Sequence, residues 1–232
     1  MYTTPNESVR LTLRALGCLL SYPDAQLRAV LPQLMDALHL EQALPPQRLN
    51  EIDALCRHLA SLAPMEAESR YVDLFDRGRQ TSLHLFEHVH GDSRDRGPAL
   101  VDLVQTYERA GLQFSAQELP DHLPVVLEFA STQPREVASE FLGEMAHILN
   151  AVFSALLKRE SPYASVIAAV LEVSGQRVQA VELAPEPGLD ETWNEPVVFD
   201  GCSSQGQSRP GQPQPVHFVR TERATPQQGD SR

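Results

Sequence analysis

Apolar residues recur every three or four positions along most of this chain, a spacing that places them on one face of an α-helix. The first such stripe comprises Val9, Leu13, Leu16 and Leu20. Before residue 176, no run alternates apolar and polar residues between hairpin turns, as strands of a half-buried sheet do. The sequence therefore predicts an all-α protein, with a single compact helical domain over residues 1–183.

Capping residues and prolines indicate where the helices begin and end. Thr4-Pro5 is typical of a first helical turn, and Ser21 to Asp24 repeats the arrangement for a second helix. Pro32 is expected to bend or break that second helix. Further helices are expected after Pro45-Pro46, in a segment that ends near Phe75, and over Leu83 to Val89. Others are expected from about Leu100 to a stop at Gly111, over Pro120 to Ala130, from Val137 to about Arg159, and from Ser161-Pro162 to near Gly175.

The composition changes after residue 183, where seven prolines and five glycines are mixed with glutamine, serine and charged residues. Such a segment buries too little apolar surface to offset the entropy lost on ordering. We therefore expect residues 184–232 to be a largely disordered, flexible tail. An apolar island from Trp193 to Phe199 could dock onto the helical domain or a partner, and the residues around Arg177 to Leu183 could form a short extended piece.

The formal charge of −12 argues against nucleic acid as a partner, because the chain would repel a phosphate backbone. An acidic surface instead attracts a basic partner. Three widely spaced cysteines are typical of reduced thiols rather than of a disulfide framework or a zinc site. No segment has the length of a membrane span, and the first apolar run lacks a basic leader. We therefore expect a cytoplasmic protein without direct membrane insertion.

Three histidines, His84, His88 and His90, are the strongest candidates for a metal site in the sequence. Four residues separate the first two, which on one helix places both imidazoles on the same face, with Glu87 and Asp92 nearby as further metal ligands. Neither a metalloprotease motif nor a nearby cysteine accompanies them, so histidines on a half-exposed helix are the favoured interpretation. No nucleophile, base and oxyanion site stand in register either. We expect no enzyme and no cofactor.

Charged residues of both signs flank this histidine-rich segment. They are Asp73, Asp76, Arg77 and Arg79 before it, and Asp92, Arg94, Asp95 and Arg96 after it. Alternating signs at such short spacing suit a paired network that fixes a loop between helices, although most surface ion pairs contribute little to stability.

Three segments resemble the nitrate reductase molybdenum cofactor assembly chaperones, the NarJ-type or delta subunit family. They are Tyr71 to Gly97 (YVDLFDRGRQTSLHLFEHVHGDSRDRG), Tyr107 to Leu112 (YERAGL) and Glu118 to Glu128 (ELPDHLPVVLE). The resemblance covers about residues 8–175, and the Trp193 island is also similar to the family's C-terminal region. Many related redox-enzyme chaperones have proline directly after the glutamate at 118, whereas this chain has Leu119.

The resemblance implies a helical fold and a definite task. Such chaperones bind the apo catalytic α subunit of respiratory nitrate reductase, partly through its N-terminal peptide. They hold it competent for molybdenum cofactor insertion, delay its docking to the membrane and are absent from the mature enzyme.

Recognition of a basic amphipathic peptide is expected to place its apolar face in a groove between helices, while acidic residues attract its cationic face. The candidate peptide-binding residues are Tyr71, Phe75, Leu103, Tyr107, Glu118, Asp121, His122 and Glu128. The apolar members could equally be plain core residues, and Asp121 and His122 could be the cap and first turn of a helix. If His122 lines the groove, its charge could tune release near neutral pH.

Two alternatives remain open from the sequence. One is a chaperone of the same fold that serves another molybdoenzyme, such as a dimethyl sulfoxide or trimethylamine oxide reductase. The other is a metal-dependent enzyme that uses His84 and His88.

Overall fold

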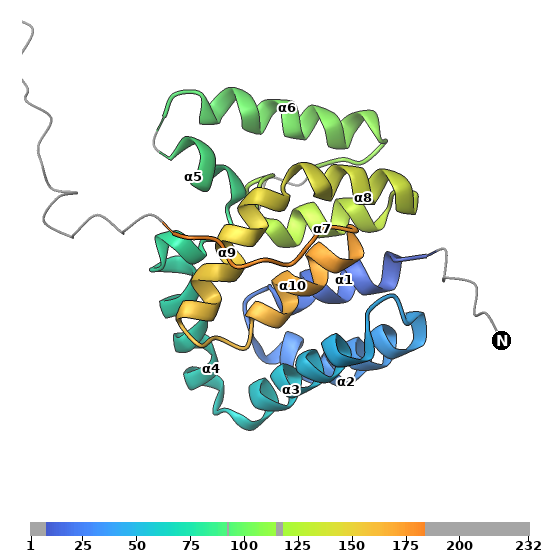
Figure 1. Ribbon diagram of the computed structural model, residues 1–232, viewed down its shortest axis with the longest axis vertical. Helices are drawn as coiled ribbons and strands as arrows, with labels where there is room; N and C mark the ends of the chain where they lie inside the picture. The colour runs from blue at the N-terminus through green and yellow to red at the C-terminus, as the bar shows by residue number, and fades with distance from the viewer. Residues whose placement is uncertain (1–7, 92, 115–117, 184–232) are drawn as a thin grey trace, which may run out of the picture. The chain divides into compact units, whose positions relative to one another are not determined.

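The computed structural model describes residues 8–91, 93–114 and 118–183. Within these ranges the chain is all-α, as predicted: it forms ten α-helices, one π-helical turn and one 3-10 turn, and no strand (Figure 1). The helices are α1 (Arg10–Leu19), α2 (Ala25–Glu41), α3 (Pro46–Ser61), α4 (Pro64–Tyr71), α5 (Leu85–His90), α6 (Arg96–Arg109), α7 (Leu123–Ser131), α8 (Arg135–Glu144), α9 (Ala146–Lys158) and α10 (Ala164–Val173). The π turn η1 (Val72–Asp76) continues α4, and the 3-10 turn η2 (Arg79–Thr81) follows it.

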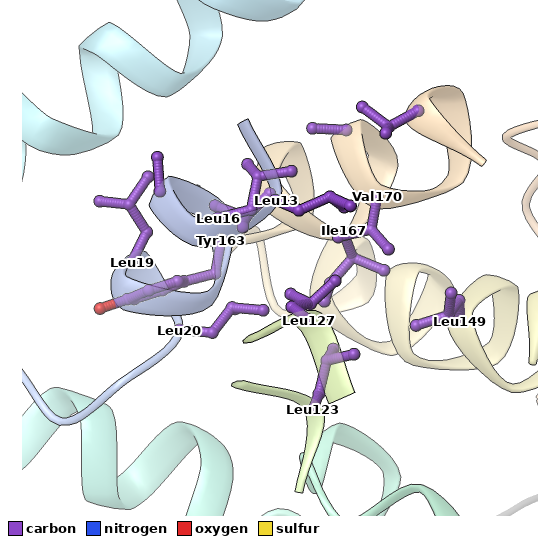
Figure 2. Packing of buried hydrophobic residues seen from close by; sticks show 14 of the residues in the cluster. Leu13, Leu16, Leu19, Leu20, Leu123, Leu127, Leu149, Tyr163, Ile167 and Val170 are labelled. Carbon is purple, nitrogen blue, oxygen red and sulfur yellow. The ribbon is translucent and has the colours of Figure 1, made fainter. Parts of the chain in front are cut away.

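Helix α10 lies at the centre of the hydrophobic core. Nine of its ten residues are buried, which is the signature of a helix surrounded by others rather than one with a single apolar face. Ile167 and Val170 pack with Leu13 and Leu16 of α1 and Leu127 of α7 (Figure 2). One cluster of buried residues thus holds the following helices together in a single helical domain: α1, α2, α3, α4, α7, α8, α9 and α10.

Helices α1 and α7 pack closely because Gly17 has no side chain. A Cβ atom at this position would lie 3.3 Å from the carbonyl oxygen of Pro124 and 3.4 Å from Cβ of Leu127. These two helices form the floor of the site described below.

The first described helix begins at Arg10, because Ser8 and Val9 are not helical; the predicted start at Thr4-Pro5 lies outside the described residues. A carboxylate from α2 replaces the local cap. Glu41 is buried and accepts hydrogen bonds from the backbone N–H groups of Leu11 (3.2 Å) and Thr12 (2.6 Å) and from the Ser8 hydroxyl (2.9 Å). These bonds satisfy amide groups that a helix start leaves without partners, and they hold the pKa of Glu41 below its ordinary value despite its burial.

The second helix begins with Asp24 as its cap, not with Ser21 as predicted. Oδ1 of Asp24 accepts a hydrogen bond from the backbone N–H of Leu27 at 2.8 Å. Pro32 does not break the helix, which runs from Ala25 to Glu41. Pro32 is exposed, so the hydrogen bond that its missing N–H cannot make is lost on the solvent side of the helix.

The long helix expected from Val137 to Arg159 is two helices, α8 and α9, which are bent by 68° at Met145. Gly143 is in the last turn of α8, and a Cβ atom there would lie 2.9 Å from Nε2 of Gln176. The chain that leaves α10 therefore packs directly against the end of α8. The local spacing of apolar residues does not predict this contact.

Glycine stops and buried stripes behave as predicted elsewhere. Gly111 (φ +81°) follows α6 and Gly175 (φ +70°) follows α10, both in the left-handed region that favours glycine. Helix α3 begins at Pro46, as Pro45-Pro46 predicts, and buries Leu49, Ile52, Leu55 and Leu59.

Residues 177–183 form no strand, but two polar side chains of α9 hold this segment. Asn150 accepts a hydrogen bond from the backbone N–H of Gln179 (2.9 Å) and donates one to the carbonyl of Arg177 (3.3 Å). Ser154 accepts one from the N–H of Val181 (2.9 Å). The predicted tail 184–232 and the Trp193 island lie outside the described residues.

No single helix among the described residues combines the length and hydropathy of a membrane span; α8 and α9 reach them only as a bent pair.

Candidate functional site

The segment before α5 is extended, not helical as predicted, and it pairs with the segment before α7. The backbone N–H of Leu123 donates to the carbonyl of Leu83 at 2.8 Å, and the N–H of Leu85 donates to that of Asp121 at 3.1 Å. This antiparallel bridge stacks the rings of His84 and His122, whose centroids lie 5.0 Å apart.

Asp121 is fully buried at this bridge. Its Oδ2 accepts a hydrogen bond from the backbone N–H of Phe86 (3.0 Å), so it caps α5 rather than α7. Nδ1 of His84 lies 3.7 Å from its Oδ1, and a guanidinium nitrogen of Arg96 lies 3.8 Å from its Oδ2. His122 occupies the cap position of α7, not its first turn. Asp121 thus links α5, α6 and the start of α7.

The two stacked histidines have pKa values shifted in opposite directions. The neighbouring carboxylate of Asp121 raises the pKa of His84, against the effect of burial. Burial lowers the pKa of His122, and the charge of His84 lowers it further. Burial raises the pKa of Asp121, but the hydrogen bonds that it accepts and the nearby cations outweigh this and hold its pKa below the ordinary value. His84 is therefore the member of the pair that takes up a proton first.

Replacing Asp121 by asparagine is expected to lower the pKa of His84, as measured by NMR titration of the imidazole protons. Because the folded-state pKa of His84 is raised, its contribution to stability is complete below its ordinary pKa of 6.5 and is lost as pH rises through the folded value. The difference in free energy of unfolding between wild type and D121N should therefore be largest near about pH 6 and shrink toward about pH 9. An identical difference at both pH values would contradict this coupling.

The predicted charge network is formed in part and with different partners. Arg96 lies 3.2 Å from Glu87, whose other oxygen accepts a hydrogen bond from the Ser82 hydroxyl at 2.6 Å. Arg77 pairs with Asp73 at 2.8 Å, but both side chains are largely exposed. The buried end of the network thus fixes α5 and α6 to the bridge, whereas the exposed pair contributes little.

His84 and His88 do not share a helix face, because His84 lies in the extended segment. Nε2 of His88 instead hydrogen-bonds the backbone carbonyl of Ser82 at 2.9 Å. Within the described parts of the chain, no three His, Cys, Asp or Glu side chains are grouped so that they could hold a metal ion.

A cavity of about 600 Å³ lies beside the histidine pair. Its wall is made by α1, the turn after α1, Tyr71, the end of η1, the bridge and α7. It is lined by Arg14, Gly17, Cys18, Ser21, Tyr22, Asp24, Tyr71, Asp76, His84, Glu118, His122, Pro124, Val125 and Glu128. The lining thus contains four carboxylates and only one guanidinium, so the cavity attracts cations. It is called the acidic cavity below.

A second cavity of about 410 Å³ adjoins the acidic cavity. It is lined by Tyr107, Leu112, Gln113, Phe114, Glu118, Val125, Glu128, Phe129 and Thr132, and it is called the aromatic cavity below. Glu118, Val125 and Glu128 belong to both linings.

The structure brings five of the eight predicted peptide-binding residues to these cavities. Tyr71, Glu118, His122 and Glu128 line the acidic cavity, and Tyr107 lines the aromatic one together with Glu118 and Glu128. The other three, Phe75, Leu103 and Asp121, are buried and line neither cavity.

Buried aromatic side chains support the acidic cavity from below. The hydroxyl of Tyr71 donates a hydrogen bond to the carbonyl of Leu20 at 2.7 Å, which fixes the end of α1. Phe75 packs against Tyr71 and Tyr163 with ring centroids 4.8 and 5.1 Å away, so it belongs to the core. Tyr22 is 45% exposed and meets Tyr71 edge-on at 5.7 Å, which leaves its ring on the cavity wall.

Sequence reasoning missed the wall formed by α1 and the following turn. Arg14, Tyr22 and Asp24 lie far from the resembling segments along the chain. A signal existed in α1, where Arg14 and Cys18 are four residues apart on its exposed face. Asp76 was singled out for a loop-fixing network, but no cation among the described residues lies within ion-pair distance of it. Burial is the main cause that raises the pKa of Tyr22 and Tyr71, and the charge of Asp76 raises the pKa of both further.

Comparisons with known proteins agree with this architecture. The chain is 39% identical over 190 residues to the nitrate reductase molybdenum cofactor assembly chaperone NarJ of Escherichia coli K12, covering 78% of this chain and 80% of that protein. A Bacillus subtilis relative named for the same role is 36% identical over 172 residues, covering 72% and 92% of the two chains.

A solved structure shows the same fold. The crystal structure of a redox enzyme maturation protein from Archaeoglobus fulgidus superposes with a TM-score of 0.52 at 18% identity, covering 76% of this chain and 98% of that one.

Residues 24–169 match the family model described as nitrate reductase delta subunit. The chain belongs to the nitrate reductase delta subunit family.

Proposed function

We propose that this protein is an assembly chaperone for respiratory nitrate reductase. It binds the apo catalytic α subunit through a basic, amphipathic N-terminal peptide and holds that subunit competent for molybdenum cofactor insertion. It acts in the cytoplasm before the complex docks to the membrane, and it is absent from the mature enzyme. The names of the two relatives support the assembly role, and the site supports the binding of a cationic segment.

The acidic cavity is the observation that carries this proposal. Asp24, Asp76, Glu118 and Glu128 line it from three different parts of the fold. Glu118 is 60% exposed at its side chain, so its carboxylate is accessible from solvent. Carboxylates arranged around an open cavity attract a cationic segment and accelerate its encounter.

The cavity also offers the apolar surface that an amphipathic helix needs. Tyr22, Tyr71, Pro124 and Val125 line the same cavity as the carboxylates. An aromatic face can hold a Lys or Arg side chain by cation–π attraction as well as by apolar contact with its methylene groups. Binding of a disordered peptide costs ordering entropy, so its affinity stays moderate and release remains easy.

No step of this function requires catalysis by the chain. The side chains of the acidic cavity bind and orient the peptide, and Asp121 keeps the bridge and α5 in place behind them.

Replacing Asp76 by asparagine is expected to weaken binding of a synthetic α-subunit N-terminal peptide about tenfold, because one carboxylate of the cavity is lost. Calorimetric titration at low salt measures this, and the loss should shrink as salt screens the charges. The matched control is D73N on the same π turn, whose carboxylate is exposed, pairs with Arg77 and does not line the cavity.

Equal weakening of peptide binding by D76N and D73N would show that the overall negative charge of the protein, and not the acidic cavity, attracts the peptide. Full retention of affinity in D76N would place the peptide elsewhere on the protein.

A further inference from the structure

The aromatic cavity differs in character from the acidic cavity beside it. Three aromatic rings, from Tyr107, Phe114 and Phe129, form its walls together with Leu112 and Val125. The rings of Tyr107 and Phe129 lie 4.5 Å apart, and those of Tyr107 and Phe114 lie 6.1 Å apart. The hydroxyl of Tyr107 is occupied by a hydrogen bond to the carbonyl of Pro120 at 2.7 Å. The ring of Tyr107 therefore offers the cavity an apolar surface.

This cavity belongs to a small hydrophobic cluster that is separate from the main core. Leu103 and Tyr107 of α6 pack on Phe129 of α7, with Phe141 of α8 at the edge of the cluster. Helix α6 lies at the outside of the helical body, beyond α8 in this view (Figure 1). The packing of α6 against this cluster leaves a largely apolar space of about 410 Å³. An apolar side chain from a partner would gain free energy by entering it.

The border between the two cavities is shared. Val125 lies on it, and Glu118 and Glu128 flank it with carboxylates that are accessible to a ligand. A peptide segment that crosses this border would meet the apolar lining of the aromatic cavity on one side. It would meet carboxylates at the border itself and in the acidic cavity on the other side. Residues three or four apart on one helix face are neighbours at about 5–6 Å, so a single helical turn can present a cation and an apolar group together.

We propose that the aromatic cavity takes one large apolar side chain of the bound basic segment, while a cation three or four residues away along its helix enters the acidic cavity. This inference rests on the proposed function, because it names how the same basic amphipathic peptide is seated. Charge complementarity at Glu118 and Glu128 favours this occupant over a neutral apolar one. The two cavities together fix the register of the peptide, since a shift by one residue turns its anchor away from the aromatic rings.

Val125→Phe tests the proposal, because a larger side chain on the border fills part of the aromatic cavity. Calorimetry with the α-subunit N-terminal peptide should show at least about tenfold weaker binding than wild type, the scale of losing one buried apolar anchor. Val137→Phe on α8 is the matched control, since Val137 is 46% exposed and lines neither cavity. It should bind as wild type does. Thermal unfolding of both variants establishes that they are folded.

A peptide series makes the test specific. Replacing the anchor residue of the peptide by alanine should weaken binding to wild type but change binding to V125F little, so that the two substitutions are not additive. If no apolar position of the peptide couples to V125F, the aromatic cavity is not the anchor site.

Photocrosslinking of the wild-type protein gives a second measurement that needs no variant. Peptides carrying benzoylphenylalanine at one apolar position each should include one that crosslinks to Tyr107, Phe114 or Phe129. Crosslinks confined to the acidic cavity or to other surfaces would overturn the inference while leaving the proposed function standing. Failure of the unmodified peptide to bind wild type at all would instead overturn the proposed function, and the anchor with it.

Discussion

Replacing Leu127 by alanine is expected to lower the free energy of unfolding by about 3–4 kcal/mol, as for a large-to-small change in a packed core. Leu127 is fully buried at the point where α7 meets Gly17 of α1 and Ile167 of α10 (Figure 2). Three helices enclose it, and their close packing limits how far they can collapse into the cavity that alanine leaves. Urea unfolding followed by circular dichroism measures the change.

The control for this prediction is Leu157→Ala on α9, whose side chain is 46% exposed. It should change the free energy of unfolding by no more than about 0.5 kcal/mol. A small loss for L127A as well would mean that α1, α7 and α10 are not packed as described.

Replacing Asp121 by alanine is expected to destabilise the fold by about 3 kcal/mol, because it removes a fully buried carboxylate and leaves two half-buried cationic groups without it. Arg96 and His84 lose their shared partner, and the backbone N–H of Phe86 loses its acceptor. Since α5 and the start of α7 are tied through this residue, peptide affinity should fall as well. Urea unfolding and calorimetry give the two measurements.

Asparagine at this position separates the two roles of Asp121. It retains an oxygen that can accept from Phe86 but removes the charge, so D121N should recover part of the stability lost in D121A. A D121A protein as stable as wild type would contradict the assignment of this carboxylate as the link between α5, α6 and α7.

The parts of the fold that were predicted from sequence are those with local causes. Pro45-Pro46 predicts the start of α3, and Gly111 and Gly175 predict helix ends because their positive φ angles suit glycine. The start of α1 depends on Glu41, and the end of α8 packs against Gln176; both partners lie far away in sequence. Caps and contacts supplied by distant residues leave no periodic signal.

The candidate site divides in the same way. Tyr71, Glu118, His122 and Glu128 were selected because they lie in the segments that resemble the family, and they line the acidic cavity. Arg14, Tyr22, Asp24 and Asp76 meet them only through the packing of α1 on α7 and the turn of η1, so local pattern could not assemble the wall. Phe75 and Leu103 carry the same kind of apolar side chain as a groove residue, yet they are core.

The central claim is that the client is the catalytic α subunit of nitrate reductase. Calorimetric titration of the full chain with that subunit's N-terminal peptide, in parallel with the N-terminal peptide of a dimethyl sulfoxide reductase, tests it most directly. We expect saturable one-to-one binding of the first peptide and binding at least about tenfold weaker for the second. Equal or tighter binding of the second peptide, or none of the first, would contradict it.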